Sequence, residues 1–423
     1  MTGALSGIRV IEFGRFIAAP YCCQLLADAG ADVIKVEPLI GDDARRNGEK
    51  YTSSEGRQYL NKNRNKRSIA CDISDATVVS ALKKLVSGAD VVVANFRPGQ
   101  AEKLGFDYAT LKKTNPTLIY AENSGFGSEG PLAATAGMDM ALQGYSGLAP
   151  LTTNGPMPLV DPVIDYSAAM LMAWGISTAL FHRERTGQGQ KLDVSLLQAS
   201  LVLQNNNINA VAEHDEHRQE FADYLKDAFA QGATWDEVIS RQSQSSSIGA
   251  TAAYYGFFRT ADQVLCLGAG GSVVQKRLLK VLDLTDPLLE EEGFKPDDIR
   301  QHVSGQRSLV EERLSQQSIE HWLPLLLAAD VPASRVNLKV QLLEDEQVLA
   351  NHYLSKMTHP VLGDVTVVSP PVKFSETELE IRTPSPTLGQ HTVEILRESG
   401  LPDNTIESLV SNGKIRDHNQ LSD

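Results

Sequence analysis

Residues 8–37 read IRVIEFGRFIAAPYCCQLLADAGADVIKVE, and this stretch decides the fold class. Residues 8–13 form a short run rich in apolar and β-branched side chains, which predicts a strand. Residues 20–29 have helical periodicity, and Gly30 is a typical helix stop. Residues 32–37 predict a second strand. Because a strand, a helix and a strand follow one another within about thirty residues, we expect a βαβ unit and a parallel sheet.

The same alternation continues along the chain. Apolar strands are predicted at residues 89–95 and 118–123, and helices at residues 75–87 and 197–211. The sequence therefore predicts an open α/β domain over roughly the first 200 residues.

Composition changes after this region and suggests the domain organisation. Residues 1–212 form the N-terminal part of a large domain, and the polar residues 213–247 form a linker that ends in the low-complexity run QSQSSS. A small α+β domain is predicted for residues 248–335. Residues 336–423 are less self-contained, so we expect this C-terminal segment to return to the large domain or to another subunit.

Charge and composition exclude several classes of function. The chain has 423 residues and a net charge of −14, which argues against nucleic acid or an anionic membrane as the main partner. Four cysteines are too few for a disulfide framework, and no CxxC pair supports a zinc site. The N-terminus has no signal-peptide pattern, and no apolar run stands out as a membrane span. We therefore expect a cytoplasmic protein.

One carboxylate stands out in the sequence LVDPVIDYSAAMLMAWGISTALFHRERTGQGQ, residues 159–190. Asp165 precedes an uncharged run at residues 168–181, which predicts a buried helix with Asp165 as its N-cap. A carboxylate there faces the positive end of the helix dipole and is partly desolvated. This environment suits a nucleophile, but an ordinary helix cap has the same pattern.

Three loops that follow predicted strands could contact a ligand. The loop at residues 13–20 opens a helix whose free N–H groups could bind an anion, although it lacks the GxGxxG fingerprint of dinucleotide sites. Asn95 and Phe96 lie at a strand end, where an amide and an aromatic ring could hold a base. Residues 124–131, SGFGSEGP, would allow a substrate close approach. Each of the three could equally be a plain structural loop.

Cations are concentrated in the first hundred or so residues of this acidic chain. Phosphate groups are a common reason for such clustering near strand ends, although each residue singly fits ordinary surface charge. The run NKNRNKRS, residues 61–68, is the strongest local case. The series comprises Arg15, Lys35, Arg45, Arg46, Lys62, Arg64, Lys66, Arg67, Arg97 and Lys103.

In order, these segments closely resemble the class III coenzyme A transferases, the CaiB/BaiF family. The resemblance runs nearly end to end, and its specificity lies in the ordered set. The segments are LSGIRVIEFGRFIAAP (5–20), LADAGADVIKVEP (26–38), NKRSIACDI (65–73), ADVVVANFRPGQAEKLGFD (89–107), SGFGSEGP (124–131), Asp165, RTGQGQKLDVSLL (185–197) and TLGQHTVEIL (387–396).

The resemblance implies a fold and an assembly. Family members combine a Rossmann-like large domain, built from the N- and C-terminal segments, with a small α+β domain that closes a ring. Two such rings interlock as a homodimer. The resemblance also implies an acyl-CoA donor and a small carboxylate acceptor, with the CoA thioester as a substrate and no tightly bound cofactor.

It further implies that Asp165 attacks the donor thioester and passes through a mixed anhydride and an aspartyl-CoA thioester. By position, CoA would be bound by Phe16, Ile17, Ala18, Arg46, Arg67, Asn95, Phe96 and Lys103. Oxalate-handling relatives have an arginine that contacts CoA where this chain has Pro38, so the phosphate contacts are expected to shift to Arg45, Arg46 or Arg67. The substrate and loop candidates are Gly125, Gly127, Asp139 and Tyr145, and residues 245–256 would be the loop that closes over the aspartate.

Three alternatives remain open at this stage. In the racemase branch of the family a histidine precedes the second aspartate, whereas Met138 stands there in this chain and cannot accept a proton. A nucleotide-dependent dehydrogenase would need the missing glycine fingerprint. In a CoA-binding protein without activity, Asp165 would only cap its helix. The sequence names neither acid of a transfer reaction, although the cations would suit a dicarboxylate such as succinate.

Overall fold

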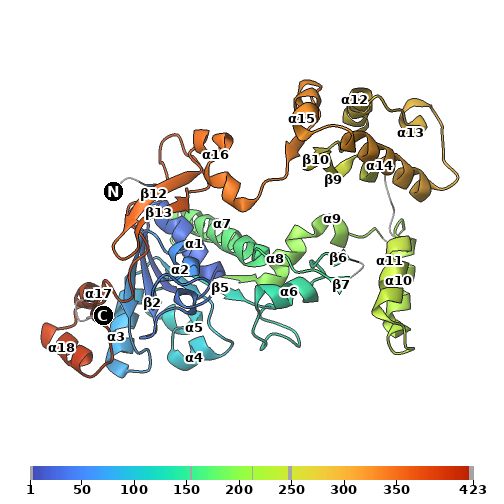
Figure 1. The fold of residues 1–423 in the computed structure, drawn as a ribbon. Coiled ribbons are helices and arrows are strands. Elements are labelled where there is room, and N and C mark those ends of the chain that lie inside the picture. The colour runs from blue at the N-terminus through green and yellow to red at the C-terminus, as the bar shows by residue number, and fades with distance from the viewer. Residues whose placement is uncertain (1–2, 153–154, 212, 246–249, 419–423) are drawn as a thin grey trace. The chain divides into compact units, whose positions relative to one another are not determined.

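The computed structural model describes residues 3–152, 155–211, 213–245 and 250–418. The chain divides into two compact units (Figure 1). Unit 1 comprises Met1–Ala210 and Leu349–Asp423, and unit 2 comprises Val211–Val348. The first unit therefore contains both ends of the chain.

The strands of unit 1 are β1 (Arg9–Phe13), β2 (Asp32–Glu37), β3 (Lys66–Ala70), β4 (Val91–Ala94), β5 (Ile119–Ser124), β6 (Leu151–Thr152), β7 (Gly155–Pro156), β8 (Lys191–Ser195), β12 (Leu354–His359) and β13 (Gly363–Val368). Its helices are α1 (Ala18–Asp28), α2 (Arg57–Leu60), α3 (Ala76–Ser87), α4 (Gln100–Leu104), α5 (Tyr108–Leu111), α6 (Asp139–Tyr145), α7 (Val163–Thr186), α8 (Leu196–Leu203), α9 (Asn205–Ile208), α17 (Thr392–Glu398) and α18 (Asp403–Ser411). A further helix, α16 (Glu346–Ala350), spans the boundary with unit 2.

The predicted parallel sheet is confirmed. Six strands lie in the order β3-β2-β1-β4-β5-β8, and every neighbouring pair is parallel. The register pairs Val10 with Val33 on one side of β1 and with Val91 on the other. From β1 the chain adds β2 and β3 on one side and then β4, β5 and β8 on the other. The order of the strands therefore reverses between β1 and β4.

Alternating side chains of the strands pack in two apolar layers, one on each face of the sheet. Val10, Val33 and Val91 face the layer that contains α1 and α7, whereas Ile11 and Ile34 face the layer that contains α3, α17 and α18. This alternation is the period-two pattern of strands covered on both faces. The sheet is therefore the central layer of an α/β/α sandwich.

The C-terminal segment belongs to the large unit and is held there by polar contacts. The Arg64 guanidinium donates to the carbonyl oxygen of Val368 at 2.6 Å, and the Asn65 amide donates to that of Glu380 at 2.6 Å. The Arg45 guanidinium donates to the Pro386 carbonyl at 3.0 Å. These contacts join residues more than 300 positions apart in the sequence.

Unit 2 has its own core. An antiparallel sheet of order β11-β10-β9 packs with helices around buried side chains such as Phe258, Leu265, Val310 and Trp322. Residues 213–247, predicted as a linker, carry two helices of this unit, and residues 246–247 lie outside the described residues. The elements are α10 (Glu216–Ala228), α11 (Trp235–Ser245), β9 (Tyr255–Arg259), β10 (Val264–Gly268), α12 (Ser272–Leu282), α13 (Pro287–Glu290), α14 (Ile299–Ser315), α15 (Ile319–Ala328) and β11 (Ala333–Arg335).

Helix α7 is long and apolar enough to meet the length and hydropathy criteria for a membrane span. It has 24 residues, and its most apolar window has a mean hydropathy of 1.3 with 39% of it buried. The buried residues, including Ala168, Met172 and Ile176, pack in the layer between the sheet and α1. Its apolar character is therefore accounted for in part by the core of unit 1.

Most of the basic run at residues 61–68 is not a surface patch, which corrects the expectation of a phosphate site there. Lys66 and Lys35 both pair with the buried Glu12 carboxylate, at 2.7 and 2.8 Å. Arg64 pairs with buried Asp28 at 2.7 Å. Sequence clustering placed these cations together, but the fold uses them to neutralise buried carboxylates, because an unpaired buried charge is costly.

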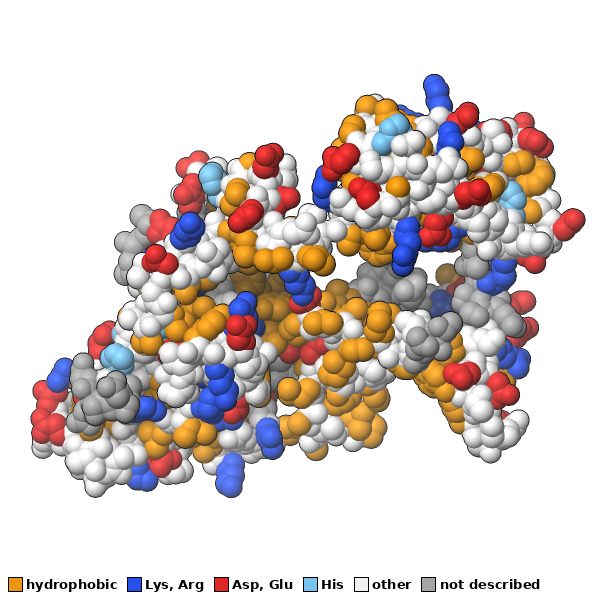
Figure 2. All heavy atoms as spheres, in the orientation of Figure 1, with side chains coloured by type: hydrophobic (Ala, Val, Ile, Leu, Met, Phe, Trp, Pro, Cys, Tyr) orange, Lys and Arg blue, Asp and Glu red, His pale blue; other side chains and the backbone are white. Residues whose placement is uncertain are grey.

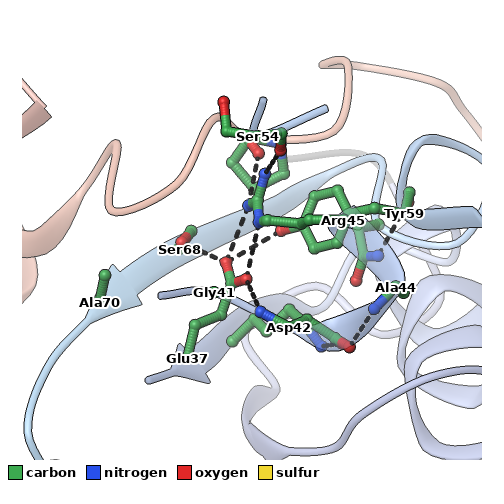
Figure 3. A network of polar contacts seen from close by, with 12 residues as sticks. Glu37, Gly41, Asp42, Ala44, Arg45, Ser54, Tyr59, Ser68 and Ala70 are labelled. Atoms are coloured by element: carbon green, nitrogen blue, oxygen red, sulfur yellow. Dashed lines mark hydrogen bonds and ion pairs between the residues drawn. The ribbon is translucent and has the colours of Figure 1, made fainter. Parts of the chain in front are cut away.

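Arg45 is likewise structural (Figure 3). Its guanidinium donates to both carboxylate oxygens of Glu37, at 2.8 and 2.9 Å, and to Glu55 at 3.1 Å, and it stacks 3.4 Å from the centre of the Tyr59 ring. Burial alone would raise the pKa of Glu37, but Arg45 overrides it and lowers this pKa to about 2. The side chain is fully buried and cannot take the place of the CoA arginine that is missing at Pro38.

Candidate active site

Two predicted ligand loops meet where the strand order reverses. The loop after β1 carries Arg15, and Asn95 directly follows β4. The backbone N–H of Arg15 donates to Asn95 Oδ1 at 3.0 Å, and Asn95 Nδ2 donates back to the Arg15 carbonyl at 2.9 Å. In open parallel sheets, ligands bind outside the carboxyl ends of strands at such a reversal. Asn95 thus fixes the shape of the loop.

Phe16 holds an unusual backbone conformation in this loop. Its φ is 65°, the left-handed region that non-glycine residues rarely adopt. The strain is offset by an anchor, since the Phe16 N–H donates to Asp42 Oδ1 at 3.2 Å. Ile17 is the N-cap of α1 and Ala18 its first residue, and no side chain caps this helix. The first-turn N–H groups of Ala18 and Ala19 therefore have no side-chain partner among the described residues.

The structure corrects the predicted start of α7. The helix begins at Val163 with Pro162 as its N-cap, so Asp165 lies within the first turn and does not cap it. The capping carboxylate comes instead from Asp139 of α6. Its Oδ2 accepts from the N–H of Ile164 at 2.9 Å and from that of Asp165 at 3.1 Å.

Asp139 is itself held by its neighbours. Gln143 Nε2 donates to Asp139 Oδ1 at 2.6 Å and to the Leu159 carbonyl at 3.1 Å, and the Leu159 N–H returns a bond to Gln143 Oε1 at 2.8 Å. This network ties α6 to the segment that enters α7. Asp139 is therefore a positioning residue for Asp165.

Gly125 sets the approach of α6. A Cβ on Gly125 would lie 2.5 Å from the Cα of Gly137, and one on Gly137 would lie 2.3 Å from the Cα of Gly125. The two backbones can cross only because both residues lack a side chain. Gly127 has a φ of 102°, and its N–H donates to Ser124 Oγ at 3.1 Å. These glycines therefore build the loop that places Asp139.

The Asp165 side chain is free of polar partners. Among the described residues, no hydrogen bond or ion pair reaches the Asp165 carboxylate. The backbone N–H of Asp165 donates to Asp139. Burial, together with the negative charge of Asp139, raises the pKa of Asp165 to about 7, although nearby Lys62 lowers it. Such a carboxyl group is poised between its two forms near neutral pH, as functional groups often are.

Aromatic contacts place Asp165 beside the start of α1. The ring of its neighbour Tyr166 lies edge-on to Tyr21 of α1, with centroids 4.8 Å apart. The Tyr166 ring also contacts Lys62, whose Nζ lies 5.8 Å from the ring centre. The start of α7 therefore packs against α1, and the buried Lys62 lies next to it.

Some predicted residues share this edge of the sheet. Phe96 follows β4 and its ring packs against Phe13 at 5.4 Å, while Lys103 is exposed on α4. Arg46 binds the carbonyl of Ile40 and lies 3.3 Å from Asp43, in the segment after β2. Tyr145 packs edge-on against Phe126 at 5.1 Å. Their contacts to CoA or substrate stay predictions.

Arg67 does not join them, and this prediction needs correction. Its guanidinium pairs with Asp32, at the start of β2, at 2.8 Å, and with Glu398 and Glu394 at 2.6 and 2.9 Å. Asp32 marks the amino edge of the parallel sheet, opposite to the edge with the ligand loops. Three carboxylates already occupy Arg67, so we withdraw it from the CoA site.

Residues 245–256, predicted as a closing loop, fall in unit 2. Residues 246–249 lie outside the described residues. From residue 250 the chain forms a short 3-10 turn (Ala250–Ala253) and then enters β9.

Sequence reasoning missed the function of two residues near Asp165. Asp139 was named only as a loop candidate, and its capping of α7 depends on a contact between residues 25 and 26 positions apart. Lys62 was grouped with the phosphate-binding cations. Nothing in the run NKNRNKRS indicated that Lys62 lies near Asp165.

Comparison with known proteins supports the family resemblance. Residues 5–392 match the sequence profile of CoA-transferase family III. The chain is 30% identical to human succinyl-CoA:glutarate CoA-transferase, over 98% of this chain and 90% of that protein. It is 32% identical to the succinate–glutarate CoA-transferase of Agrobacterium fabrum, over 93% of this chain and 95% of that protein.

Solved structures agree. A CaiB/BaiF family protein from Brucella suis superposes with a TM-score of 0.73 at 28% identity, covering 94% of this chain and 100% of that one. A Mycobacterium tuberculosis protein at 24% identity shares the fold with a TM-score of 0.74, over 93% of this chain and 99% of that one. Together with the parallel sheet and the unpartnered Asp165, these matches identify the chain as a member of CoA-transferase family III, the CaiB/BaiF CoA-transferases.

Proposed function

We propose that this enzyme transfers CoA between carboxylic acids through covalent intermediates on Asp165. The observation that carries the proposal is that the Asp165 carboxylate, in the first turn of α7, has no hydrogen bond or ion pair among the described residues. A carboxylate that serves only as a cap would accept hydrogen bonds from backbone N–H groups, and here Asp139 performs that role.

The first half of the reaction acylates the enzyme. An Asp165 oxygen attacks the carbonyl carbon of the donor thioester, and the C–S bond breaks to give a mixed anhydride and CoA thiolate. The thiolate then attacks the aspartyl carbonyl carbon. The donor acid leaves as a carboxylate, and the enzyme carries an aspartyl-CoA thioester.

The second half reverses these steps with the acceptor. The acceptor carboxylate attacks the aspartyl carbonyl carbon and expels CoA thiolate, which forms a second anhydride. The thiolate then attacks the acceptor acyl carbon, which releases the new thioester and regenerates the Asp165 carboxylate. No proton is gained or lost over the cycle, so the site needs charge stabilisation more than an acid or base.

The start of α1 supplies donors for the tetrahedral intermediates. The N–H groups of Ala18 and Ala19 lie in the first turn of α1 and have no partner within the helix. Phe16, Ile17, Asn95, Phe96, Arg46 and Lys103 are the proposed CoA-binding residues at this edge. Gly125, Gly127 and Tyr145 are proposed to lie beside the acyl group.

A succinyl-CoA donor and a small dicarboxylate acceptor are the proposed substrates. The support is that relatives over nearly the full chain are named for succinyl-CoA and glutarate, and another, from Chloroflexus aurantiacus, for succinyl-CoA and L-malate at 29% identity. The racemase alternative is disfavoured because Met138, the residue before Asp139, cannot exchange a proton.

An interlocked homodimer is the proposed assembly, with its interface on α6 and α7. Trp174 and Phe181 of α7 are 70% and 64% exposed, and Met138 and Met140 on or beside α6 are also exposed. Figure 2 shows orange side chains gathered over α6 and the β6–β7 hairpin. Exposed apolar area of this kind marks an interaction surface.

The test is mass spectrometry of the enzyme after incubation with succinyl-CoA and a panel of other acyl-CoAs. Hydroxylamine should trap an adduct that peptide mapping assigns to Asp165, and the thioester that labels it identifies the donor. Cα proton exchange without such an adduct would instead favour the racemase reaction.

The matched variant is Asp165→Asn, which removes the nucleophile and keeps the shape. It should lose transfer while CoA binding, measured by calorimetry, is retained. Full turnover by this variant would refute the mechanism.

A further inference from the structure

Lys62 is a buried cation for which the proposed reaction sequence gives no role. It lies in the turn after α2 and is only 2% exposed. Its Nζ donates to Asn61 Oδ1 at 2.8 Å and to the Gln58 carbonyl at 3.1 Å. An ammonium group has three N–H donors, so one remains after these two bonds.

The surroundings of Lys62 connect it to both parts of the site. Its Nζ lies 5.8 Å from the ring centre of Tyr166, the residue that follows Asp165 on α7. The charges of Asp165 and of Asp42, after β2, both raise the pKa of Lys62, and Asp42 Oδ1 accepts from the Phe16 N–H. The positive charge of Lys66 on β3 lowers the pKa of Lys62, but Glu12 pairs with Lys66 at 2.7 Å. Asp42 in turn pairs with Lys35 at 2.9 Å.

Asp165 therefore has no ion-pair partner among the described residues, and Lys62 can balance its negative charge. The charge of Lys62 lowers the pKa of Asp165, and that of Asp139 raises it. Asp139 is fully engaged with the N–H groups of α7 and with Gln143. Lys62 and Asp165 thus form a charge pair that stays outside ion-pair distance, with no direct bond between them.

We propose that Lys62 is the electrostatic partner of the reacting carboxylates: it balances Asp165 in the resting enzyme and attracts the acceptor carboxylate once Asp165 is acylated. This proposal rests on the proposed function. Acylation turns Asp165 into a neutral anhydride or thioester. While CoA thiolate or the departing donor acid is present, that anion balances Lys62.

After the donor acid leaves, the aspartyl-CoA thioester is neutral and Lys62 has lost its counter-charge. A buried uncompensated cation is unfavourable, so the site then favours entry of one carboxylate next to the aspartyl carbon. In the resting enzyme the same anion would meet the negative charge of Asp165. The charge of Lys62 therefore directs a free carboxylate to the acylated form of the enzyme.

The pKa values of the two side chains agree with this arrangement. Burial lowers the pKa of Lys62 to about 8, although Asp165 and Asp42 raise it, so the side chain is mostly protonated at pH 7. Because Lys62 lowers the pKa of Asp165, its removal should raise that pKa further above its present value of about 7. A lysine that served only to hold the turn would leave the KM for the free acid unchanged, so this KM distinguishes the two roles.

The experiment measures exchange of ¹³C-labelled succinate into succinyl-CoA, which needs only the donor and its own acid. If another thioester labels Asp165, that acyl-CoA and its acid replace the pair. Lys62→Met should raise the KM for the free acid by about 10- to 100-fold, from the strength of hydrogen bonds to charged groups. CoA binding should stay within about twofold of the wild type, since the proposed CoA residues are unchanged.

Two further variants separate charge from structure. Lys62→Arg keeps the charge and should recover most of the lost affinity for the acid. Lys113→Met removes an exposed lysine of the same unit and should change neither parameter. Among these variants, only Lys62→Met should move the acid limb of the pH profile of kcat/KM to higher pH.

Unchanged KM and pH profile in Lys62→Met would overturn the proposal, as would an equal effect in Lys113→Met. Should Lys62→Met fail to fold by circular dichroism, Lys62→Gln takes its place with the same expected result. Hydroxylamine labelling of wild-type Asp165 keeps the two proposals distinct. Labelling with an unchanged Lys62→Met refutes the role of Lys62, whereas absence of labelling with every thioester refutes the proposed function itself.

Discussion

Replacement of Asp139 by alanine removes the acceptor of three hydrogen bonds at the start of α7. Two come from the N–H groups of Ile164 and Asp165, at 2.9 and 3.1 Å, and one comes from Gln143 at 2.6 Å. Asp139 is only 8% exposed, so water cannot fully replace it. Loss of a cap costs about 0.5–2 kcal/mol and a bond to a charged group about 1.5–3 kcal/mol. Because one carboxylate makes all three bonds, we expect Asp139→Ala to lower the free energy of unfolding by roughly 2–4 kcal/mol.

Asp139→Asn separates the cap from the charge. One oxygen remains for the α7 N–H groups, but the new amide faces the Gln143 amide, so the loss should be about half as large. Both variants remove the negative charge that raises the pKa of Asp165. The nucleophile must be ionised, so kcat/KM rises with pH through the pKa of Asp165, and this acid limb should move to lower pH in Asp139→Asn.

Calorimetric melting of the three proteins and the pH profile of kcat/KM for the donor thioester measure the two effects. A melting temperature of Asp139→Ala equal to that of the wild type would refute the capping role. An acid limb that stays in place or rises in Asp139→Asn would refute the charge argument.

Three further predictions concern other parts of unit 1. Glu37→Gln leaves Arg45 buried with a weaker partner and should destabilise the protein by roughly 3–5 kcal/mol at neutral pH in chemical denaturation. The lowered pKa of Glu37 means that its contribution is present above about pH 4.5 and lost as pH falls toward 2, so this variant should lose less stability than the wild type over that range. Arg67→Met should leave the KM for acyl-CoA within about twofold of the wild type, and a rise of tenfold or more would restore Arg67 to the CoA site. Trp174→Glu should weaken the proposed dimer, so that sedimentation gives a smaller average mass than for the wild type, whereas equal masses would refute an interface at Trp174.

The local pattern of the chain predicted the elements that carry the site. The alternation of strands and helices predicted that the loop at residues 14–17 and Asn95 follow strand ends. Parallel pairing of β1 and β4 brings both to the same edge of the sheet. Asp165 was found because an isolated carboxylate at the start of an apolar helix is conspicuous in sequence. These features depend on side-chain periodicity and on neighbours within a few residues.

Pairings between distant residues could not be predicted in this way. Arg67 and Lys62 lie in one basic run, yet Arg67 pairs with carboxylates of β2 and α17 while Lys62 faces α7. The direction of each side chain depends on strand alternation and on the path of the chain far away. The predicted start of α7 was wrong for a related reason, because the carboxylate that caps this helix belongs to another helix.

The return of residues 349–423 to the first unit has a consequence for synthesis on the ribosome. Arg45 is made early, but its carbonyl acceptor at Pro386 emerges only after the whole of unit 2 has been translated. At about 5–20 residues per second, the 341 residues between them take roughly 17 to 70 seconds to synthesise. Throughout that time β3 and the apolar face that α17 later covers remain open on the nascent chain. We therefore expect the newborn large domain to depend on chaperone protection more than its final stability would indicate.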